Sequence, residues 1–332
     1  MMKWADQGFW KSLLFYRQSV LYYWLLSAWY RSFTWYGAAN PAILHAGMLN
    51  EKKSDIYPLL PKEFLPYTST ALDSDQILQA LASGLLAFPL VIKPDIGLKG
   101  IAVKVCENEK ELSDYVSASS RDHFIVQEYI DLPREFSVLF YRVGAKEKGV
   151  FSFIEKKYPR VTGDGSTSLH ELINKHSHAY LNKQAVLTQH NNKIPLQGEE
   201  IVLHTIGNYA QGSTFHSLQN EIDAALVEGI DTCMQKVEGI DFCRLDLKAS
   251  DIEAIRRGSF KIIEVNGGKS EPLHIYDPKV GFWEACVIIH RHWKLYTRIV
   301  NHHLAKGFQL MSTAEGVRAL KHIKTIVKNK NR

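Results

Sequence analysis

Cysteine is scarce in this 332-residue sequence, and none of its four cysteines lies in a CxxC pair. The spacing therefore indicates neither a disulfide framework nor a zinc site, and it is typical of a protein in a reducing compartment. The fourteen histidines include no HExxH motif, which is the usual helical zinc signature. From these absences we expect a cytoplasmic protein.

The sequence also lacks a strong excess of charge of either sign. Lys and Arg number 40 against 35 Asp and Glu, which gives a net charge of +5. This balance does not indicate nucleic-acid binding, which usually requires a concentrated basic surface. With 332 residues, 45% of them hydrophobic, the chain can bury a sizeable core spread over about two or three subdomains.

A long uninterrupted hydrophobic run is absent as well. Residues 9–36 are aromatic-rich and predict a helix, but Lys11, Arg17 and Arg31 interrupt it. Its uncharged stretch, 18–30, is shorter than the roughly 20 residues that a bilayer crossing needs, and it lacks a signal-peptide cleavage site. Two interpretations stay open. The aromatic face packs on the rest of the protein, or the helix lies at a membrane surface with its basic side chains on lipid phosphates.

Polar residues that could bind a ligand or take part in catalysis lie in two apolar segments, the first beginning at Phe242 and the second ending at Asn266. The alternation predicts two neighbouring strands, on which side chains two apart share a face. Arg244 and Asp246 then share one face, and Glu264 and Asn266 share another. If the faces coincide, their oxygens suit Mg²⁺ and the guanidinium suits a transferring phosphoryl group. The alternative is two ordinary strands with a surface salt bridge.

A second candidate strand, FPLVIKP, includes Lys93 near its end. Gly97 and Gly100 in the following loop allow the backbone to approach a phosphate closely, and the lysine adds a positive charge. This spacing matches neither the P-loop nor the Rossmann fingerprint. Further on, edge amides from Gln127 to Ile130 are candidates for hydrogen bonds to a nucleotide base. Glu135 is a candidate for the ribose hydroxyls, and the alternative is a carboxylate exposed at a strand end.

Taken in order, these segments resemble the ATP-grasp superfamily. The set is IKP with its two glycines, QEYI with its following glutamate, RVTGDGSTSLHELI, RLD and EVN. It is most similar to the nucleotide-binding parts of D-alanine–D-alanine ligase and cyanophycin synthetase, over roughly residues 60–300. The resemblance implies an α+β ATP-grasp fold, with two α+β subdomains that hold ATP between their sheets. The implied domains are a helical and irregular extension (1–66), the N-terminal subdomain (67–150), the C-terminal subdomain (151–306) and a basic C-terminal helix (307–332).

The resemblance also implies roles for individual residues. Lys93 resembles the lysine that holds the α- and β-phosphates, and residues 97–100 resemble the loop that closes over them. Arg244 resembles the arginine at the transferring phosphate, so it and Lys93 are the implied catalytic residues. The implied ATP contacts are Lys93, Gly97, Gly100, Gln127, Glu128, Tyr129, Ile130 and Glu135. The implied Mg²⁺ ligands are Asp246, Glu264 and Asn266.

The sequence departs from D-alanine ligases on both sides of this core. Those ligases carry a full α/β domain where this chain has an aromatic helix and an irregular loop. They also have a short Pro-Gly loop where this chain has GGKSEPLHIYDP after Asn266, so we expect a substrate other than D-alanine. The candidate substrate contacts are Arg160, Ser270, Glu271, His274 and Tyr276. The alternative is that SEPLHIYDP is a structural turn with its histidine in the core.

The expected activity is the ATP- and Mg²⁺-dependent joining of a carboxylate to an amine through an acyl phosphate. Small-molecule or peptide substrates are the expected partners, and nucleic acid is not. Two alternatives stay open, a kinase of the same superfamily and a non-catalytic nucleotide-binding module at a membrane surface. The complete set of Asp246, Glu264 and Asn266 argues against the second, because a sensor has less need of a phosphoryl-transfer site. We expect a cytoplasmic protein, either free or peripheral to the inner membrane face through residues 9–36.

Overall fold

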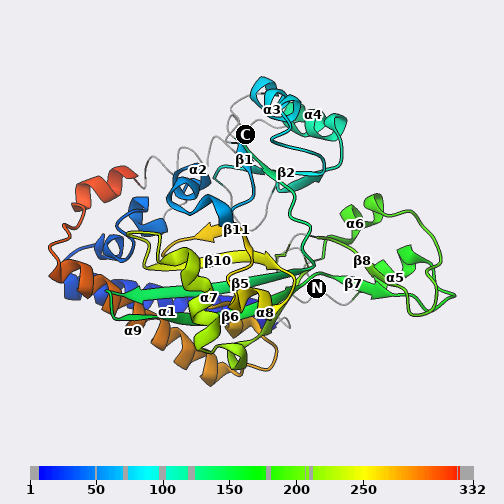
Figure 1. Cartoon of the computed structure of the whole chain (residues 1–332). Helices are drawn as coiled ribbons and strands as arrows, with labels where there is room; N and C mark the ends of the chain where they lie inside the picture. The colour runs from blue at the N-terminus through cyan, green and yellow to red at the C-terminus, as the bar shows by residue number, and fades with distance from the viewer. Residues whose placement is uncertain are drawn as a thin grey trace.

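The fold has three parts in the computed structural model of the chain (Figure 1). A five-stranded sheet with helices forms the body, a four-stranded sheet stands above it, and a two-stranded arm extends to one side (Figure 1). This arrangement is the α+β class that the sequence predicts. The residues that the structure describes are 7–48, 51–69, 74–96, 102–118, 124–176, 181–205, 207–208, 212–319 and 321.

The larger sheet is antiparallel throughout, with strand order β11-β10-β5-β6-β9. Along β10, Arg244, Asp246 and Lys248 alternate with apolar side chains, which suits a sheet with two differently covered faces. The pair β10 and β11 is the one expected between Phe242 and Asn266, and a short helix, α8, lies between them. The strands are β5 (Arg134–Val143), β6 (Glu147–Lys157), β9 (Thr214–Ser217), β10 (Phe242–Ala249) and β11 (Lys261–Asn266).

One face of this sheet packs against α7 (Ala224–Met234) and α8 (Ile252–Arg256), where the largest hydrophobic core lies. Both helices begin at an aspartate whose side chain accepts a backbone N–H. Asp223 accepts from Leu226, and Asp251 accepts from Ala254, each at 2.7 Å. The caps fix where each helix starts and therefore how it lies on the sheet.

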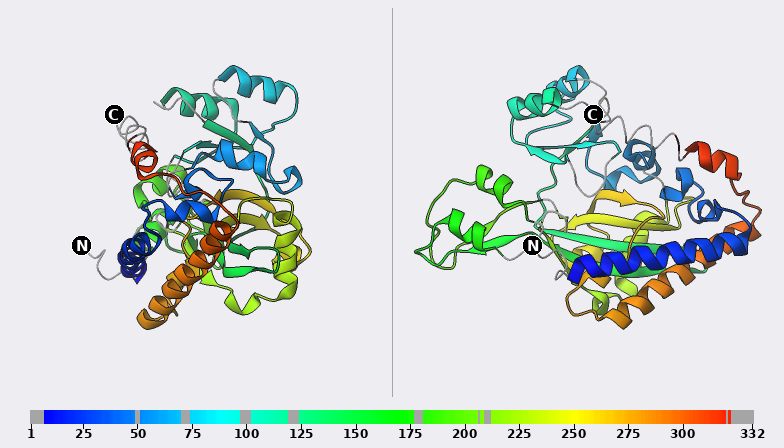
Figure 2. Two further views of the ribbon diagram at one scale, coloured as in Figure 1. Left: turned by 90° about the vertical axis from the view of Figure 1, so that its left-hand side faces the viewer. Right: turned by 180° about the vertical axis from the view of Figure 1, so that it is seen from behind.

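The opposite face is divided between a hydrophobic end and a polar end. Over the hydrophobic end, α1 (Gln7–Tyr30), the short helix η2 (Trp35–Ala39) and α9 (Phe282–Ala305) cover Leu139 and Phe242. Helices α1 and α9 run side by side there (Figure 2). One side of α1 therefore packs on the body, as the first interpretation of the aromatic segment expects. The polar end of the same face carries the candidate site.

The smaller sheet has strand order β1-β4-β2-β3 and a separate core with α3 and α4. The predicted boundary at residue 150 does not follow the sheets, because β5 already belongs to the larger sheet as the hairpin partner of β6. The change of sheet falls between β4 and β5. The elements are β1 (Thr68–Ser69), α3 (Ser74–Ala82), β2 (Leu90–Pro94), β3 (Lys104–Cys106), α4 (Glu109–Ala118) and β4 (Phe124–Glu128).

The arm has a small core of its own. Its elements are β7 (Arg160–Thr162), α5 (Leu169–Lys175), α6 (Lys183–Gln189) and β8 (Glu200–Val202). Short helices supply much of the remaining chain: η3 (Leu44–Gly47), α2 (Lys53–Ile56), η4 (Tyr57–Leu59), η5 (Lys62–Phe64), η7 (Gln219–Glu221) and η8 (Leu273–Tyr276).

The expected basic C-terminal helix is described only in part. Residues 313–319 are helical, and its lysines and arginine beyond 321 lie outside the described residues. Within the described ranges, no helix combines the length and the apolar character that crossing a bilayer requires.

Candidate functional site

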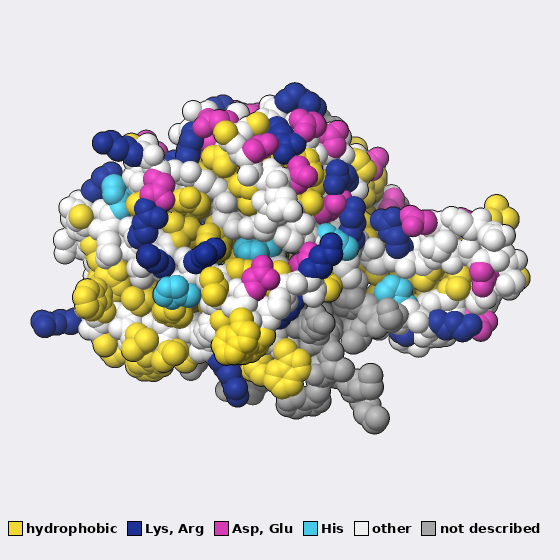
Figure 3. Space-filling model, turned by 90° about the horizontal axis from the view of Figure 1, so that it is seen from below, with side chains coloured by type: hydrophobic (Ala, Val, Ile, Leu, Met, Phe, Trp, Pro, Cys, Tyr) yellow, Lys and Arg dark blue, Asp and Glu magenta, His cyan; other side chains and the backbone are white. Residues whose placement is uncertain are grey.

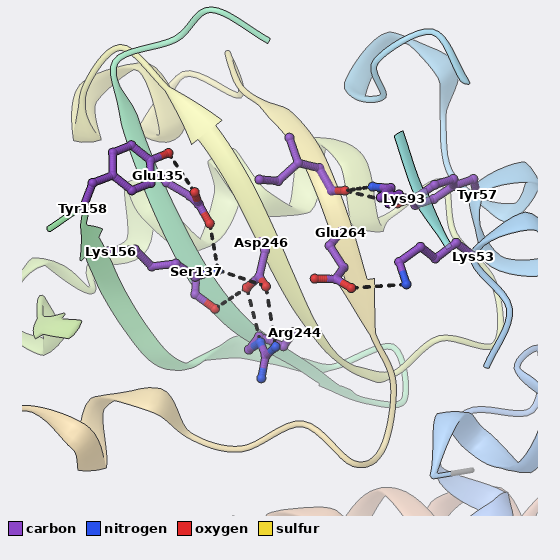
Figure 4. A network of polar contacts seen from close by, with 11 residues as sticks. Lys53, Tyr57, Lys93, Glu135, Ser137, Lys156, Tyr158, Arg244, Asp246 and Glu264 are labelled. Carbon is purple, nitrogen blue, oxygen red and sulfur yellow. Dashed lines mark hydrogen bonds and ion pairs between the residues drawn. The ribbon is translucent and has the colours of Figure 1, made fainter. Parts of the chain in front are cut away.

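The polar end of the larger sheet brings the expected side chains of β10 and β11 onto one face (Figure 4). In the register of the two strands, Asp246 lies opposite Glu264 and Arg244 lies opposite Asn266. Directly opposite side chains share a face, so the two faces coincide as expected. The register shifts immediately after Asp246, and such irregularities are frequent beside functional sites.

Asp246 is buried between two cations. Its carboxylate accepts from Arg244 Nε at 3.2 Å and lies 3.1 Å from Lys156 Nζ, and the Ser137 hydroxyl donates to it at 2.6 Å. Burial alone raises the pKa of Asp246, but Arg244 and Lys156 outweigh burial and hold the pKa at about 2. The aspartate is therefore ionised at neutral pH and available to a cation.

Glu264 faces the other chain segment that reaches the site. Its Oε1 lies 3.4 Å from Nζ of Lys53, a buried lysine at the start of α2. Burial tends to raise the pKa of Glu264, and the Lys53 ammonium overrides this and lowers it. Both carboxylates of the pair therefore carry negative charge, surrounded by lysine and arginine side chains from distant parts of the sequence.

Lys93 projects from the smaller sheet onto the larger one. Its ammonium donates to the backbone carbonyl of Ile263 at 2.8 Å and to the Tyr57 hydroxyl at 3.0 Å (Figure 4). Burial is the dominant influence and lowers the pKa of Lys93 to about 7. Lys93 lies between the two sheets, and burial disfavours its positive charge. An anionic group of a ligand bound there would therefore stabilise the charged form. Gly97 and Gly100, the expected phosphate loop, lie outside the described residues.

Glu135 is buried on β5, so the alternative of an exposed acid at a strand end is wrong for this residue. Its two oxygens accept from Lys156 Nζ and from the Tyr158 hydroxyl, each at 2.8 Å. Lys156 thus bridges Glu135 and Asp246 across three strands. A ribose at Glu135 has to share its carboxylate with these two donors.

The segment expected to meet the adenine base is partly committed to the sheet. Because β4 lies between β1 and β2, its last residues are not at an edge, which corrects the expectation of free edge amides. The backbone N–H of Glu128 donates to Tyr67 at 2.9 Å, and its side chain is exposed. The side-chain amide of Gln127 donates to the Thr68 hydroxyl at 2.7 Å. The linker that follows is therefore the part of this segment left outside the ladder.

Lys248 supports that linker. Its ammonium donates to the carbonyl of Ile130 at 2.9 Å and lies over the ring of Tyr129, 4.8 Å from its centre. Burial lowers the pKa of Lys248. The linker residues Tyr129 and Ile130 are thus fixed to the same polar end of the sheet as Asp246.

Two of the five candidate substrate contacts are buried and hydrogen-bonded inside the protein. Ser270 is buried, and its hydroxyl donates to the carbonyls of Asn266 and Gly267. His274 is buried, and its Nδ1 lies 2.8 Å from the Ser152 hydroxyl. His274 is therefore in the environment that the structural-turn alternative describes, because its polar atom already has a partner inside the core.

Glu271 and Tyr276 lie together at the base of the loop, with the tyrosine hydroxyl donating to the carboxylate. Burial and the negative charge of Glu271 raise the pKa of Tyr16 of α1. The charges of Glu271 and Arg244 also act on each other. This pair is the part of the candidate substrate set that the fold brings beside the β10–β11 site.

Arg160 is not gathered with the others. It lies on β7 in the arm, is exposed, and pairs with Glu200 at 2.7 Å. It lines a shallow hollow at the base of the arm, together with Lys157, Tyr158 and His176. Its contact with a substrate stays a prediction, and it requires a ligand that reaches from the sheet to the arm.

The donor set fits a magnesium ion that shares its shell with phosphate. Asp246 and Glu264 supply two opposed carboxylates, and Asn266 has a buried side-chain nitrogen without a hydrogen-bond partner among the described residues. This NH₂ group is a hydrogen-bond donor, so it suits a phosphate oxygen of a ligand, while the amide oxygen of Asn266 is the atom that would face the cation. The described residues contain no cluster of three or more His, Cys, Asp and Glu that forms a metal site by itself. Mg²⁺ usually takes one or two carboxylates plus substrate phosphates, and the pair Asp246 and Glu264 offers two.

Sequence reasoning missed three cations of the site, Lys53, Lys156 and Lys248. A signal for Lys156 was present, because the polar turn after Val143 centres a hairpin that pairs Glu135 with Lys156. Lys53 and Lys248 carried no such signal. Lys53 comes from an irregular segment far from Glu264 in sequence, and the alternation on β10 places Lys248 on the correct face without indicating its partner.

Part of the chain matches a known protein family. Residues 52–146 match the sequence model of a family described as the RimK-like ATP-grasp domain. The match covers the smaller sheet and β5 and ends before β10 and β11. The roles of Arg244, Asp246, Glu264 and Asn266 therefore stay predictions. No curated protein matches the chain.

Several solved structures are distantly similar. A bifunctional glutathione synthetase from Pasteurella multocida is 17% identical with a TM-score of 0.42, covering 77% of this chain and 38% of that one. The D-alanine–D-alanine ligase from Bacillus anthracis is 15% identical with a TM-score of 0.40, covering 76% and 67%. N5-carboxyaminoimidazole synthetase from Staphylococcus aureus, complexed with ADP, is 12% identical with a TM-score of 0.37, covering 68% and 47%. The match of residues 52–146 to the RimK-like ATP-grasp model confirms the ATP-grasp fold that the sequence motifs predicted.

Proposed function

We propose that this chain is an ATP- and Mg²⁺-dependent ligase that joins a carboxylate to an amine through an acyl phosphate. The observation that carries the proposal is the register that sets Asp246 against Glu264, with Arg244 and Asn266 as the next opposed pair. Two ionised carboxylates, a guanidinium and an unsatisfied amide then share one face. Phosphoryl transfer needs this combination of positioning and charge.

Each cation has a separate task in this mechanism. Lys93 extends from the smaller sheet to the larger one, so it would hold the nucleotide phosphates between the two sheets. Nucleotide binding would then hold the two sheets together. Arg244 lies beside Asp246 and opposes the charge that develops on the transferring phosphoryl group. Lys156 holds Asp246 and Glu135 in place at once. Asp246, Glu264 and Asn266 would hold Mg²⁺, which when bound neutralises charge on the phosphate oxygens.

The proposed reaction has two displacements. A carboxylate oxygen of the acid substrate attacks the γ-phosphorus of ATP, the bond to the bridging oxygen breaks, and ADP leaves. The amine nitrogen then attacks the acyl carbon, the carbon–oxygen bond to phosphate breaks, and the amine loses a proton as phosphate leaves. Glu271, the carboxylate of the loop that follows Asn266, would bind the ammonium form of the amine, which loses one proton to solvent before its nitrogen attacks.

Product analysis tests the proposed function. The purified chain with ATP and Mg²⁺ is offered panels of acids and amines, and ADP, inorganic phosphate and organic products are quantified. A ligase gives ADP, phosphate and an amide in equal amounts, and the release requires both substrates. ADP with a phosphorylated product and no free phosphate replaces the ligase with a kinase. Nucleotide binding without ADP release for every pair replaces it with a non-catalytic module.

A further inference from the structure

The outward face of α1 is an exposed hydrophobic stripe. Val20, Leu21, Trp24, Leu25 and Trp29 are spaced so that they fall on one broad side of the helix, and all are exposed, from 57% for Val20 to 79% for Trp29. Figure 3 shows hydrophobic side chains gathered along the lower left of the underside, with Lys and Arg side chains standing out beside them. An exposed patch of this kind on a folded domain marks an interaction surface.

The stripe is not a consequence of loose packing. The inner side of α1 is tied along its length to α9 and its neighbours, because Lys11 donates to the Asp277 carbonyl, Ser19 accepts from the Trp293 indole, and Tyr30 donates to Asn301. Phe15 is buried in the same interface. A helix held this firmly presents its other side permanently, so the exposed tryptophans cannot turn inward.

The segment that carries the stripe has basic side chains and no acidic ones. The sequence contains no Asp or Glu between Gln7 and Met48. Arg17 and Arg31 on this segment, and Arg291 and Lys294 on the neighbouring α9, are exposed. Among the described residues, none of these four side chains forms an ion pair. The positive charges are therefore available to an anionic partner.

We propose that the outward face of α1 docks on the surface of an anionic lipid bilayer, with α1 lying in the plane of the interface. Tryptophan and leucine side chains would enter the boundary between headgroups and acyl chains, and arginine and lysine would contact lipid phosphates. A second copy of the chain fits this face poorly, because symmetric pairing brings its unpaired positive charges together. The proposal does not depend on the reaction, because the docking residues lie outside the β10–β11 site.

Vesicle binding tests the proposal on the full chain. We expect cosedimentation with vesicles of phosphatidylglycerol and phosphatidylcholine, weaker binding to phosphatidylcholine alone, and loss of the difference at high salt. The triple variant Leu21→Gln, Trp24→Gln, Leu25→Gln is expected to reduce the partition coefficient on anionic vesicles at least about tenfold. Arg17→Gln and Lys294→Gln are each expected to reduce it about fivefold, on anionic vesicles only.

A matched control uses hydrophobic side chains that are equally exposed elsewhere. Ile194 and Leu196 in the arm are 58% and 75% exposed, and changing both to Gln is expected to leave vesicle binding unchanged. Circular dichroism and the unfolding midpoint establish that every variant is folded. Absence of binding to anionic vesicles by the unaltered chain overturns the proposal. So does a dimer in sedimentation velocity that the triple variant abolishes, because the face then pairs with a second copy.

Discussion

Substitution of Glu264 tests the proposed metal site most directly. Glu264→Gln keeps the side-chain shape and removes one of the two opposed negative charges. We expect turnover to fall at least about a hundredfold and the Mg²⁺ concentration for half-maximal activity to rise, because a carboxylate ligand contributes more than an outer-shell contact does. Mg²⁺ titration of ADP release measures both quantities.

The matched control for this variant is Glu253→Gln. Glu253 is an exposed carboxylate of α8 that pairs with Arg256 on the surface. It should leave both the turnover and the Mg²⁺ dependence unchanged, since exposed ion pairs contribute little. Unaltered ADP release by Glu264→Gln in moderate Mg²⁺ contradicts the ligand assignment.

Lys93 predicts a pH dependence of nucleotide affinity. Burial lowers its pKa to about 7, so above that pH the free protein holds the neutral amine and must take up a proton to bind phosphate. We expect ATP affinity to fall as the pH rises from about 7.5 to about 9.5, by at most about tenfold per unit. Adenosine, which lacks phosphates, should show no such fall. Calorimetry in buffers of different ionisation enthalpy measures the proton uptake.

The variant Lys93→Met separates this effect from a general change in the site. Removing one charge-assisted contact should weaken ATP roughly tenfold to a hundredfold near neutral pH, abolish the proton uptake and leave adenosine affinity unchanged. Equal losses for ATP and adenosine would instead place Lys93 in the scaffold between Tyr57 and Ile263.

How much of the site is predictable from sequence differs from residue to residue. Arg244, Asp246, Glu264 and Asn266 can be placed together because the two-residue repeat of a strand fixes their faces, and adjacency in sequence favours pairing of the two strands. The burial of His274 could not be predicted, because it depends on Ser152, a residue 122 positions away. Long-range packing of that kind leaves no periodic trace in the sequence.

At the scale of elements, α1 reaches the candidate substrate loop. The Glu271 carboxylate acts on Tyr16 of α1 and accepts a hydrogen bond from Tyr276. Glu271→Gln should therefore raise the KM of the acid or the amine, with ATP affinity near that of the unaltered chain. Tyr16→Phe removes a hydroxyl on which this carboxylate acts, so we expect a smaller rise, about twofold to tenfold. Substrate-dependent ADP release and nucleotide titration, performed together, measure the two effects.

Tyr22→Phe is the control on the same helix. Tyr22 contacts His290 of α9 and not the loop, so this change should leave the KM of both substrates unaltered. Full activity of both Glu271→Gln and Tyr16→Phe, or a loss of stability in place of a rise in KM, would make the loop a scaffold. The substrate site would then be sought in the segment from Asn40 to Lys53, which packs against the glycines after Asn266.

For the N-terminal helix, the sequence pattern predicted the helix but not which of its sides packs on the body. Its composition predicted a helix, and its aromatic residues allowed either packing or interfacial contact. The structure divides these between two sides, since Phe15 and Tyr22 pack inward and Trp24 and Trp29 face outward. Hydrophobic residues on both sides give no single apolar face, so the pattern could not show which side packs.

At the scale of the whole molecule, one face of the larger sheet is divided into a covered hydrophobic end and a polar end. Helices α1, η2 and α9 seal its hydrophobic end, and its polar end carries the candidate site. His292 lies where these parts meet, against Phe15 of α1, Phe151 of β6 and Phe242 of β10. The protonation of this one buried side chain therefore reports on whether the helical layer is docked on the sheet.

The burial of His292 predicts that acid loosens the whole fold. Burial lowers the pKa of His292 to about 3 and that of His274 to about 4, so in the folded chain both stay neutral where the unfolded chain is protonated. The unfolding free energy therefore falls as the pH drops below about 6.5, by up to about 1.4 kcal/mol per pH unit for each histidine. Between about pH 6.5 and 5 most carboxylates remain ionised, so these histidines dominate the slope. Urea unfolding across this window measures it.

His292→Phe should reduce that slope, because it removes one buried neutral histidine while His274 and His45, whose pKa values burial also lowers, remain, and the new ring suits the surrounding aromatic side chains. His290→Phe is the matched change on α9, where the histidine is exposed, and it should leave the slope unchanged. If the unfolding free energy of the unaltered chain is flat between pH 6.5 and 5, the helical layer does not exclude protons from His292. If His292→Phe keeps the full slope, the acid sensitivity belongs to other groups.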